Sequence, residues 1–116
     1  MNAHLQIMNL AMPLIGTLNQ AQGALFSAVI DAVQEEITAQ VRPDADPTQC
    51  DDSLVLAAVL LSVSAMRKLM DSDISDFTAG TLKVGLRDDR SAYAQMAERL
   101  IAPWRADGFA FRGVSG

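Results

Sequence analysis

Three aspartates that lie close together in the sequence are candidates for binding a metal ion. Asp71, Asp73 and Asp76 lie in the stretch DSDISD, whose spacing is similar to the start of a calcium-binding loop. Such a loop needs a glycine at its sixth position and a glutamate at its twelfth. Counted from Asp71, these positions hold Asp76 and Leu82. The stretch therefore predicts a turn that ends a helix. We expect no metal site, and a metal-dependent enzyme built on these carboxylates is the weakest function considered.

The other reactive side chains lack the partners that catalysis requires. Cys50 is the single cysteine, and the negative charges of Asp51 and Asp52 beside it oppose thiolate formation. His4 is the single histidine, and its place near the N-terminus predicts a solvent-exposed side chain. The aspartate pairs at 51–52 and 88–89 each precede a predicted helix, where capping accounts for them. We expect no catalytic residue, no cofactor and no enzymatic activity.

Hydrophobic periodicity predicts a mainly α-helical fold, a small bundle of three main helices. Apolar residues recur at helical spacing over 17–41 and again over 88–105. Residues 53–70 are apolar nearly all the way round, which predicts a central, buried helix. Its apolar run over 54–66 spans about 20 Å, less than the roughly 30 Å of a bilayer core, so we expect no membrane span. The predicted core consists of Leu25, Val29, Val33, Leu56, Leu60, Val63, Leu100, Ile101 and Trp104.

A chain of 116 residues has the size of one domain, and we expect residues 1–116 to form a single unit. Residues 1–16 predict an N-terminal arm or short helix that ends near Pro13. The helical body covers 17–106 and contains a proline- and aspartate-rich linker at 42–52. Residues 107–116 predict an extended C-terminal tail.

Acidic residues are concentrated in the first half of the chain, which has a net charge of −5 overall. Residues 1–52 contain seven acidic side chains and one basic side chain, whereas residues 53–116 contain seven and eight. An acidic first half argues against nucleic-acid binding by charge attraction there.

The stretch SDFTAGTLKVGL at 75–86 alternates apolar and polar residues, which predicts a short β hairpin or a single strand. A two-stranded ribbon is only marginally stable by itself in water. We therefore expect it to contact a neighbouring subunit, through Phe77, Leu82, Val84 and Leu86.

The C-terminal tail also shows strand-like alternation. Phe109 and Phe111 would face one side of an extended segment, with Arg112 on the other. Exposed phenylalanines favour binding to another protein. The docking residues that we expect are Phe109, Phe111, Arg112 and Val114.

Two motifs resemble a known family. SDFTAGTLKV follows the second main helix, and LIAPW leads into GFAFRGV. Together they resemble the head–tail connector proteins, also called adaptor or head-completion proteins, of long-tailed bacteriophages and prophages. The resemblance covers roughly residues 17–116. It implies small helical subunits that assemble as a homo-oligomeric ring, typically a dodecamer, with no enzymatic activity and no cofactor.

The resemblance also implies partners and a location. Such a ring lies in the neck of the virion and is assembled in the host cytoplasm. It joins the portal protein, on which the tail would dock, to the stopper or tail-terminator protein. Double-stranded DNA passes through the ring without specific binding. An acidic wall would let the duplex slide, because it repels phosphate, and the channel-facing candidates are Asp31, Glu35 and Glu36.

A second interpretation belongs to another functional class. The chain could be a small cytoplasmic helical regulator or interaction module that acts as a dimer. It would bind a partner helix in a methionine-bearing groove made by Met66, Met70 and Met96. The mass in solution separates a ring from a dimer.

Overall fold

The computed structural model describes residues 3–70, 85–86 and 89–106 of the chain. Helices account for 81% of this part, and no strand occurs in it, which confirms the mainly α-helical class. The elements are α1 (His4–Ile15), α2 (Gln20–Gln40), α3 (Pro47–Met70), α5 (Ala92–Ile101) and a 3₁₀ turn, η1 (Ala102–Trp104).

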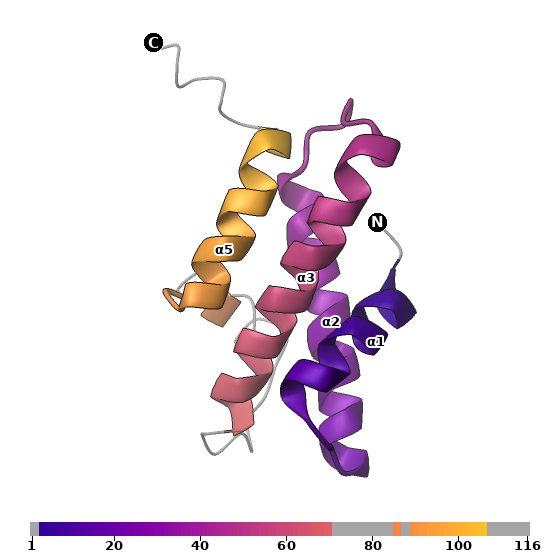
Figure 1. The fold of residues 1–116 in the computed structure, drawn as a ribbon, viewed down its shortest axis with the longest axis vertical. Helices are drawn as coiled ribbons and strands as arrows, with labels where there is room; N and C mark the ends of the chain where they lie inside the picture. The colour runs from indigo at the N-terminus through magenta and orange to yellow at the C-terminus, as the bar shows by residue number, and fades with distance from the viewer. Residues whose placement is uncertain (1–2, 71–84, 87–88, 107–116) are drawn as a thin grey trace.

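Helix α3 is the centre of the bundle (Figure 1). Helices α1 and α2 pack against it from one side, and α5 packs against it from the other. The long apolar stretch of α3 is therefore covered by three neighbours. The window Asp51–Met70 is long and apolar enough to cross a membrane, a test that the core helix of a soluble protein also passes. In this chain 61% of that window is buried inside the protein.

The N-terminal segment, predicted as an arm or a short helix, is a helix that packs into the core. Helix α1 continues through Pro13 to Ile15. Ile7 and Ala11 are completely buried on its inner face. Pro13 lies inside the helix, where its missing N–H removes one backbone hydrogen bond. Gly16 then ends the helix with a φ of 93°, a conformation that glycine adopts readily.

The helix boundaries differ from the predicted ones where side chains cap the backbone. Helix α2 is capped by Asn19. The Asn19 side chain accepts from the Gln22 backbone N–H at 2.8 Å, and the Gln22 side chain accepts from the Asn19 N–H at 3.0 Å. This reciprocal pair is a capping box. Similarly, α5 is capped by Ser91 and not by the aspartates at 88–89.

Helix α3 begins within the predicted linker. It starts at Pro47, so the connection between α2 and α3 is much shorter than the predicted 42–52. Proline favours the first helical position because its missing N–H has no partner there in any case. Asp51 and Asp52 are the fifth and sixth residues of the helix and are exposed, so they lie inside it and do not cap it as the sequence predicted.

Most of the predicted core is correct. Val29, Val33, Leu60, Val63 and Ile101 are buried. Three others of the set are partly buried: Leu25, Leu100 and Trp104. The prediction is wrong for Leu56, which is 47% exposed. The sequence missed several residues that are completely buried: Ile7, Phe26, Ile30, Ile37 and Met66.

The predicted hairpin is not supported. Gly85 and Leu86 lie in a helical turn. Leu86 is buried among the core residues of its own subunit. This burial accounts for the apolar character of Leu86 without a strand. The rest of the predicted hairpin, residues 75–84, lies outside the described residues.

The ends of α2 and α5 are tied together. The Arg42 N–H donates to the Trp104 carbonyl at 2.9 Å, and the Ala106 N–H donates to the Gln40 carbonyl at 2.8 Å. The Arg42 guanidinium also lies 5.5 Å from the centre of the Trp104 ring. These contacts fix one end of α5 beside α2, although the body of α5 packs mainly on α3.

Candidate functional site

A depression of about 700 Å³ lies between α2 and α5. It exists because α5 packs on α3 and meets α2 closely only at the tied ends. Its floor is apolar and includes Leu61, Leu86 and Ile101. Its rim is polar and carries both signs of charge: Glu36, Gln40, Asp89, Arg90, Gln95, Glu98 and Arg99.

A buried carboxylate lies at the edge of this depression. The side chain of Asp89 is only 1% exposed. It accepts from the Ser64 hydroxyl at 2.6 Å and from the Ser91 N–H at 2.9 Å. The Lys68 ammonium lies 3.1 Å from Oδ1 of Asp89, the oxygen that also accepts from the Ser91 N–H. Burial by itself raises the pKa of Asp89, but hydrogen bonds from Ser64, Ser91 and Lys68 outweigh it and hold the pKa below its usual value.

The Asp89 cluster has the properties of a structural joint. Both carboxylate oxygens are occupied by donors from α3 and from the start of α5. Ser64 also lies 2.9 Å from the Ser91 hydroxyl, which caps α5. A charged carboxylate held in this way is a weak base, so it does not serve as a general base near neutral pH. The cluster therefore sets where α5 begins on α3.

A second polar cluster has the atom order of a catalytic triad. The Ser27 hydroxyl lies 3.2 Å from Nε2 of His4, and Nδ1 of His4 lies 2.6 Å from Oδ1 of Asp31. Ser27 belongs to the interior of α2, where backbone N–H groups bond to carbonyls one turn earlier. The N–H of Ser27 is therefore not free to bind an oxyanion, as the nucleophile's own N–H does in chymotrypsin-like proteases. The Asp31 side chain is also 62% exposed. We interpret this cluster as the fastening of α1 to α2.

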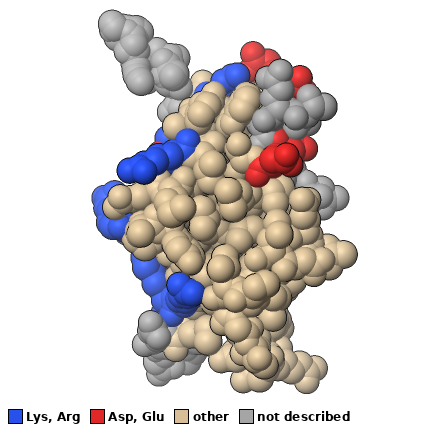
Figure 2. Space-filling view, in the orientation of Figure 1, with Lys and Arg blue, Asp and Glu red and all other residues tan. Residues whose placement is uncertain are grey.

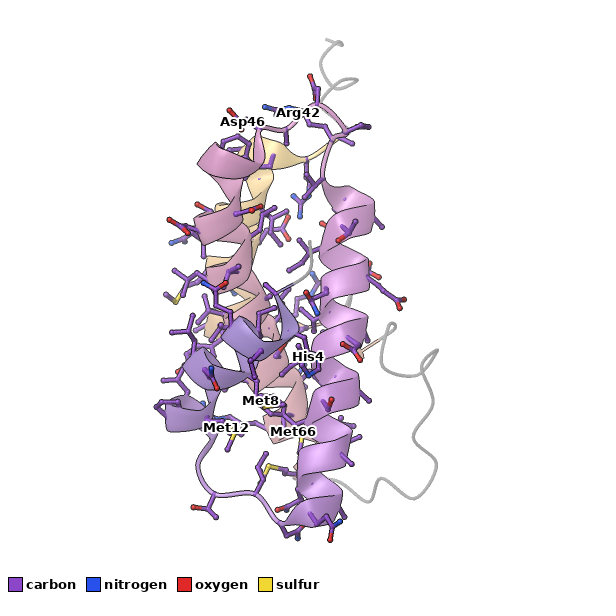
Figure 3. All side chains as sticks on the ribbon, turned by 90° about the vertical axis from the view of Figure 1, so that its right-hand side faces the viewer. His4, Met8, Met12, Arg42, Asp46 and Met66 are labelled. Carbon is purple, nitrogen blue, oxygen red and sulfur yellow. The ribbon has the colours of Figure 1, made fainter. Side chains whose placement is uncertain are left out.

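His4 is thus half-buried and bonded, which corrects the prediction of an exposed terminal histidine. Its side chain is 32% exposed and contacts two residues of α2 (Figure 3). The backbone N–H of Ala3 adds a further link, because it donates to the Gln34 side chain at 2.8 Å. No feature of the sequence indicated these contacts, since they join residues that are distant in the chain.

Helix α1 turns a set of large apolar side chains to solvent. Leu5 is 71% exposed, Leu10 is 50% exposed and Leu14 is 41% exposed. The first 30 residues of the chain contain no Asp, Glu, Lys or Arg. The leucines lie around the exposed Gln6, Asn9 and Pro13 on the outer surface of the helix, and exposed apolar side chains of this size favour a protein–protein contact. We call Leu5, Leu10 and Leu14 the α1 leucines.

The acidic channel candidates separate onto two surfaces of α2. Asp31 and Glu35 line a hollow on one side of the helix, together with Thr38. Glu36 lines the depression between α2 and α5. Asp31 is also engaged by His4. The structure therefore brings together two of the three predicted residues.

The remaining predicted site residues lie mostly outside the described part of the chain. This is the case for Phe77, Leu82 and Val84 of the subunit contact, and for the whole docking tail: Phe109, Phe111, Arg112 and Val114. It also holds for the aspartates at 71, 73 and 76. Leu86, the fourth residue of the predicted subunit contact, is buried within its own subunit.

Among the residues that the structure describes, no three His, Cys, Asp or Glu side chains are grouped closely enough to hold a metal ion. Comparisons of the chain with protein-family models, with curated proteins and with solved structures find no match.

Proposed function

We propose that this chain is a structural subunit of a bacteriophage neck. It would form the adaptor ring that joins the portal of the head to the stopper or tail and extends the DNA channel. The proposal takes its family from the two motifs SDFTAGTLKV and LIAPW–GFAFRGV. The structural observation that supports it best is the exposure of three leucines on α1, a helix without Asp, Glu, Lys or Arg.

Two further features favour a structural role. The polar clusters around Asp89 and His4 consist of side chains that bond to each other between helices. They stabilise the arrangement of α1, α2, α3 and α5 and leave the exposed surface to make contacts. A subunit that is held rigidly by such joints is suited to repeat the same contact around a ring.

One of the three methionines predicted to line the groove of a regulatory dimer is not accessible to a partner. Met70 and Met96 are exposed by 42% and 49%, but Met66 is completely buried in the core. A regulatory dimer that binds a partner helix through all three methionines is therefore disfavoured. A dimer remains a possible outcome of the experiment below.

Light scattering coupled to size-exclusion chromatography tests the proposal. The purified chain is measured alone and then with the portal protein encoded in the same genome. We expect a large ring, alone or on the portal, that is visible by negative-stain microscopy. A stable dimer that ignores the portal would instead support the regulator.

A further inference from the structure

Charged side chains gather on two opposite flanks of the molecule (Figure 2). Asp and Glu lie at the upper right, near the turn between α2 and α3, with basic side chains beside them at the top, whereas most of the Lys and Arg on this face lie along the left edge, over α5 and the lower end of α3. We define the acidic flank by Asp44, Asp51 and Asp52. We define the basic flank by Arg90 and Arg99, which lie just before and within α5.

Four of these side chains are available to a partner. Asp51, Asp52, Arg90 and Arg99 are all exposed. Within the described part of the chain, none of the four forms an ion pair, whereas Asp44 pairs with Arg42 and Arg105 pairs with Glu98. The charges that remain unpaired are therefore negative on one flank and positive on the other.

The two flanks also differ in shape and polarity. Helix α1, which carries the α1 leucines, lies on the same side of the molecule as the first turns of α3 and below the turn between α2 and α3 (Figure 1). The depression between α2 and α5 lies on the other side, with Arg90 and Arg99 on its rim and Leu61 and Ile101 in its floor. The rim of the depression also carries Glu36, Asp89 and Glu98. Asp89 pairs with Lys68, and Glu98 pairs with Arg105, whereas Arg90 and Arg99 form no ion pair with a described residue.

We infer that a second copy of this chain docks head to tail, with the acidic flank and α1 leucines of one subunit against the basic flank and depression of the next. Two acidic flanks or two basic flanks repel each other, so pairing of identical surfaces is disfavoured. Contact between different surfaces leaves each subunit with one surface still open. Such a contact, repeated with a closing rotation, generates a ring. The inference rests on the proposed function and names the surfaces by which it would assemble.

Charge reversal tests the contact. One variant carries Asp51→Lys and Asp52→Lys, and the other carries Arg90→Glu and Arg99→Glu. Each variant alone presents like charges on both flanks, so we expect each to lose the large species in light scattering. An equal mixture of the two restores opposite charges at every contact. We expect the mixture to recover the large species, as alternating rings with an even number of subunits.

Glu35→Lys changes an exposed acid on α2 outside both flanks and serves as the control that should assemble normally.

The outcomes separate this inference from the proposed function. If either double variant assembles as the unaltered chain does, or if mixing restores nothing, the flank contact is wrong while a ring on the portal still supports the adaptor. If unaltered subunits associate head to tail but ignore the portal, the flank contact stands and the adaptor function fails. A chain that stays monomeric with and without portal overturns both.

Circular dichroism shows whether the charge-reversal variants fold. If they do not, neutral variants test the same contact. Asp51→Asn with Asp52→Asn weakens one flank, and Arg90→Gln with Arg99→Gln weakens the other. In a mixture, the Asn variant keeps its basic flank and the Gln variant keeps its acidic flank, so only these two surfaces can pair. Head-to-tail docking therefore predicts dimers that contain one of each variant. Larger species, or dimers of a single variant, would overturn the inference.

Discussion

Ser62 and Ser64 lie two residues apart in α3 and are both buried. The Ser64 hydroxyl donates to Asp89 at 2.6 Å. The Ser62 hydroxyl has no hydrogen-bond partner among the described residues. A buried polar group without a partner destabilises the folded state, whereas one that satisfies a buried carboxylate stabilises it.

These two serines predict opposite effects of the same substitution. We expect Ser62→Ala to raise the free energy of unfolding by about 1 kcal/mol, and Ser64→Ala to lower it by about 2 kcal/mol. Urea denaturation of both variants measures the difference, and each serves as the control for the other. Equal effects of the two substitutions would contradict the assignment of the Ser64–Asp89 hydrogen bond.

Asp89 predicts a defined dependence of stability on pH. Its pKa in the folded protein lies below the ordinary value of 3.8, so the carboxylate contributes stability above pH 3.8 that is lost as the pH falls through the folded pKa. We expect Asp89→Asn to lower the free energy of unfolding by about 2 kcal/mol at neutral pH. This deficit should shrink in acid, because the unaltered protein then loses the same contribution.

Urea denaturation at a series of pH values checks this expectation. Asp44→Asn is the matched control, because Asp44 is 84% exposed and pairs only with Arg42 at the surface. We expect that change to have little effect at any pH. A deficit of Asp89→Asn that stays constant from neutral to acid pH would show that the charge of Asp89 is not what stabilises the fold.

At the scale of elements, α1 decides whether the N-terminus is an arm or part of the core. Its inner face buries Ile7 completely, while its outer face leaves Leu5 71% exposed. Contacts from His4 and Ala3 to α2, and from the Arg67 guanidinium to the Leu14 carbonyl at 2.8 Å, hold the helix in place. Helix α1 therefore belongs to the same folding unit as α2 and α3.

Truncation of the two apolar residues should separate the inner face from the outer. We expect Ile7→Ala to lower the free energy of unfolding by about 2–5 kcal/mol, since it leaves a cavity between α1 and the rest of the bundle. Leu5→Ala should change it little, because the side chain gains little burial on folding. Chemical denaturation measures both. A small effect of Ile7→Ala would mean that α1 is a detachable arm.

At the scale of the whole molecule, the separation of charge predicts how assembly responds to salt. Raising the ionic strength from about 0.01 M to about 1 M shortens the screening length from about 30 Å to about 3 Å. We expect the large species to dissociate over this range, because the attraction between unlike flanks is screened. Light scattering across a salt series follows it. Assembly that grows stronger with salt would indicate a contact made by the α1 leucines alone.

The sequence alone determined the helical class and the central place of α3. Spacing at three and four residues identifies a helix wherever one face is buried, and an apolar run with no polar face identifies the helix that is covered on several sides. These signals are local, so they do not need the tertiary structure. Of the nine core residues that they predicted, five are buried, three are partly buried, and one, Leu56, is exposed.

Other features were decided only in three dimensions. Because α3 is apolar nearly all round, its pattern could not show that Leu56 points outward. His4 meets Ser27 and Asp31 across 23 and 27 residues of chain, and Ser64 meets Asp89 across 25. Such contacts depend on how helices pack, which a local pattern does not encode. The two charged flanks have the same origin: the acidic first half and the more basic second half are visible in the sequence, but packing of α5 and α1 on opposite sides of α3 sets them apart in space.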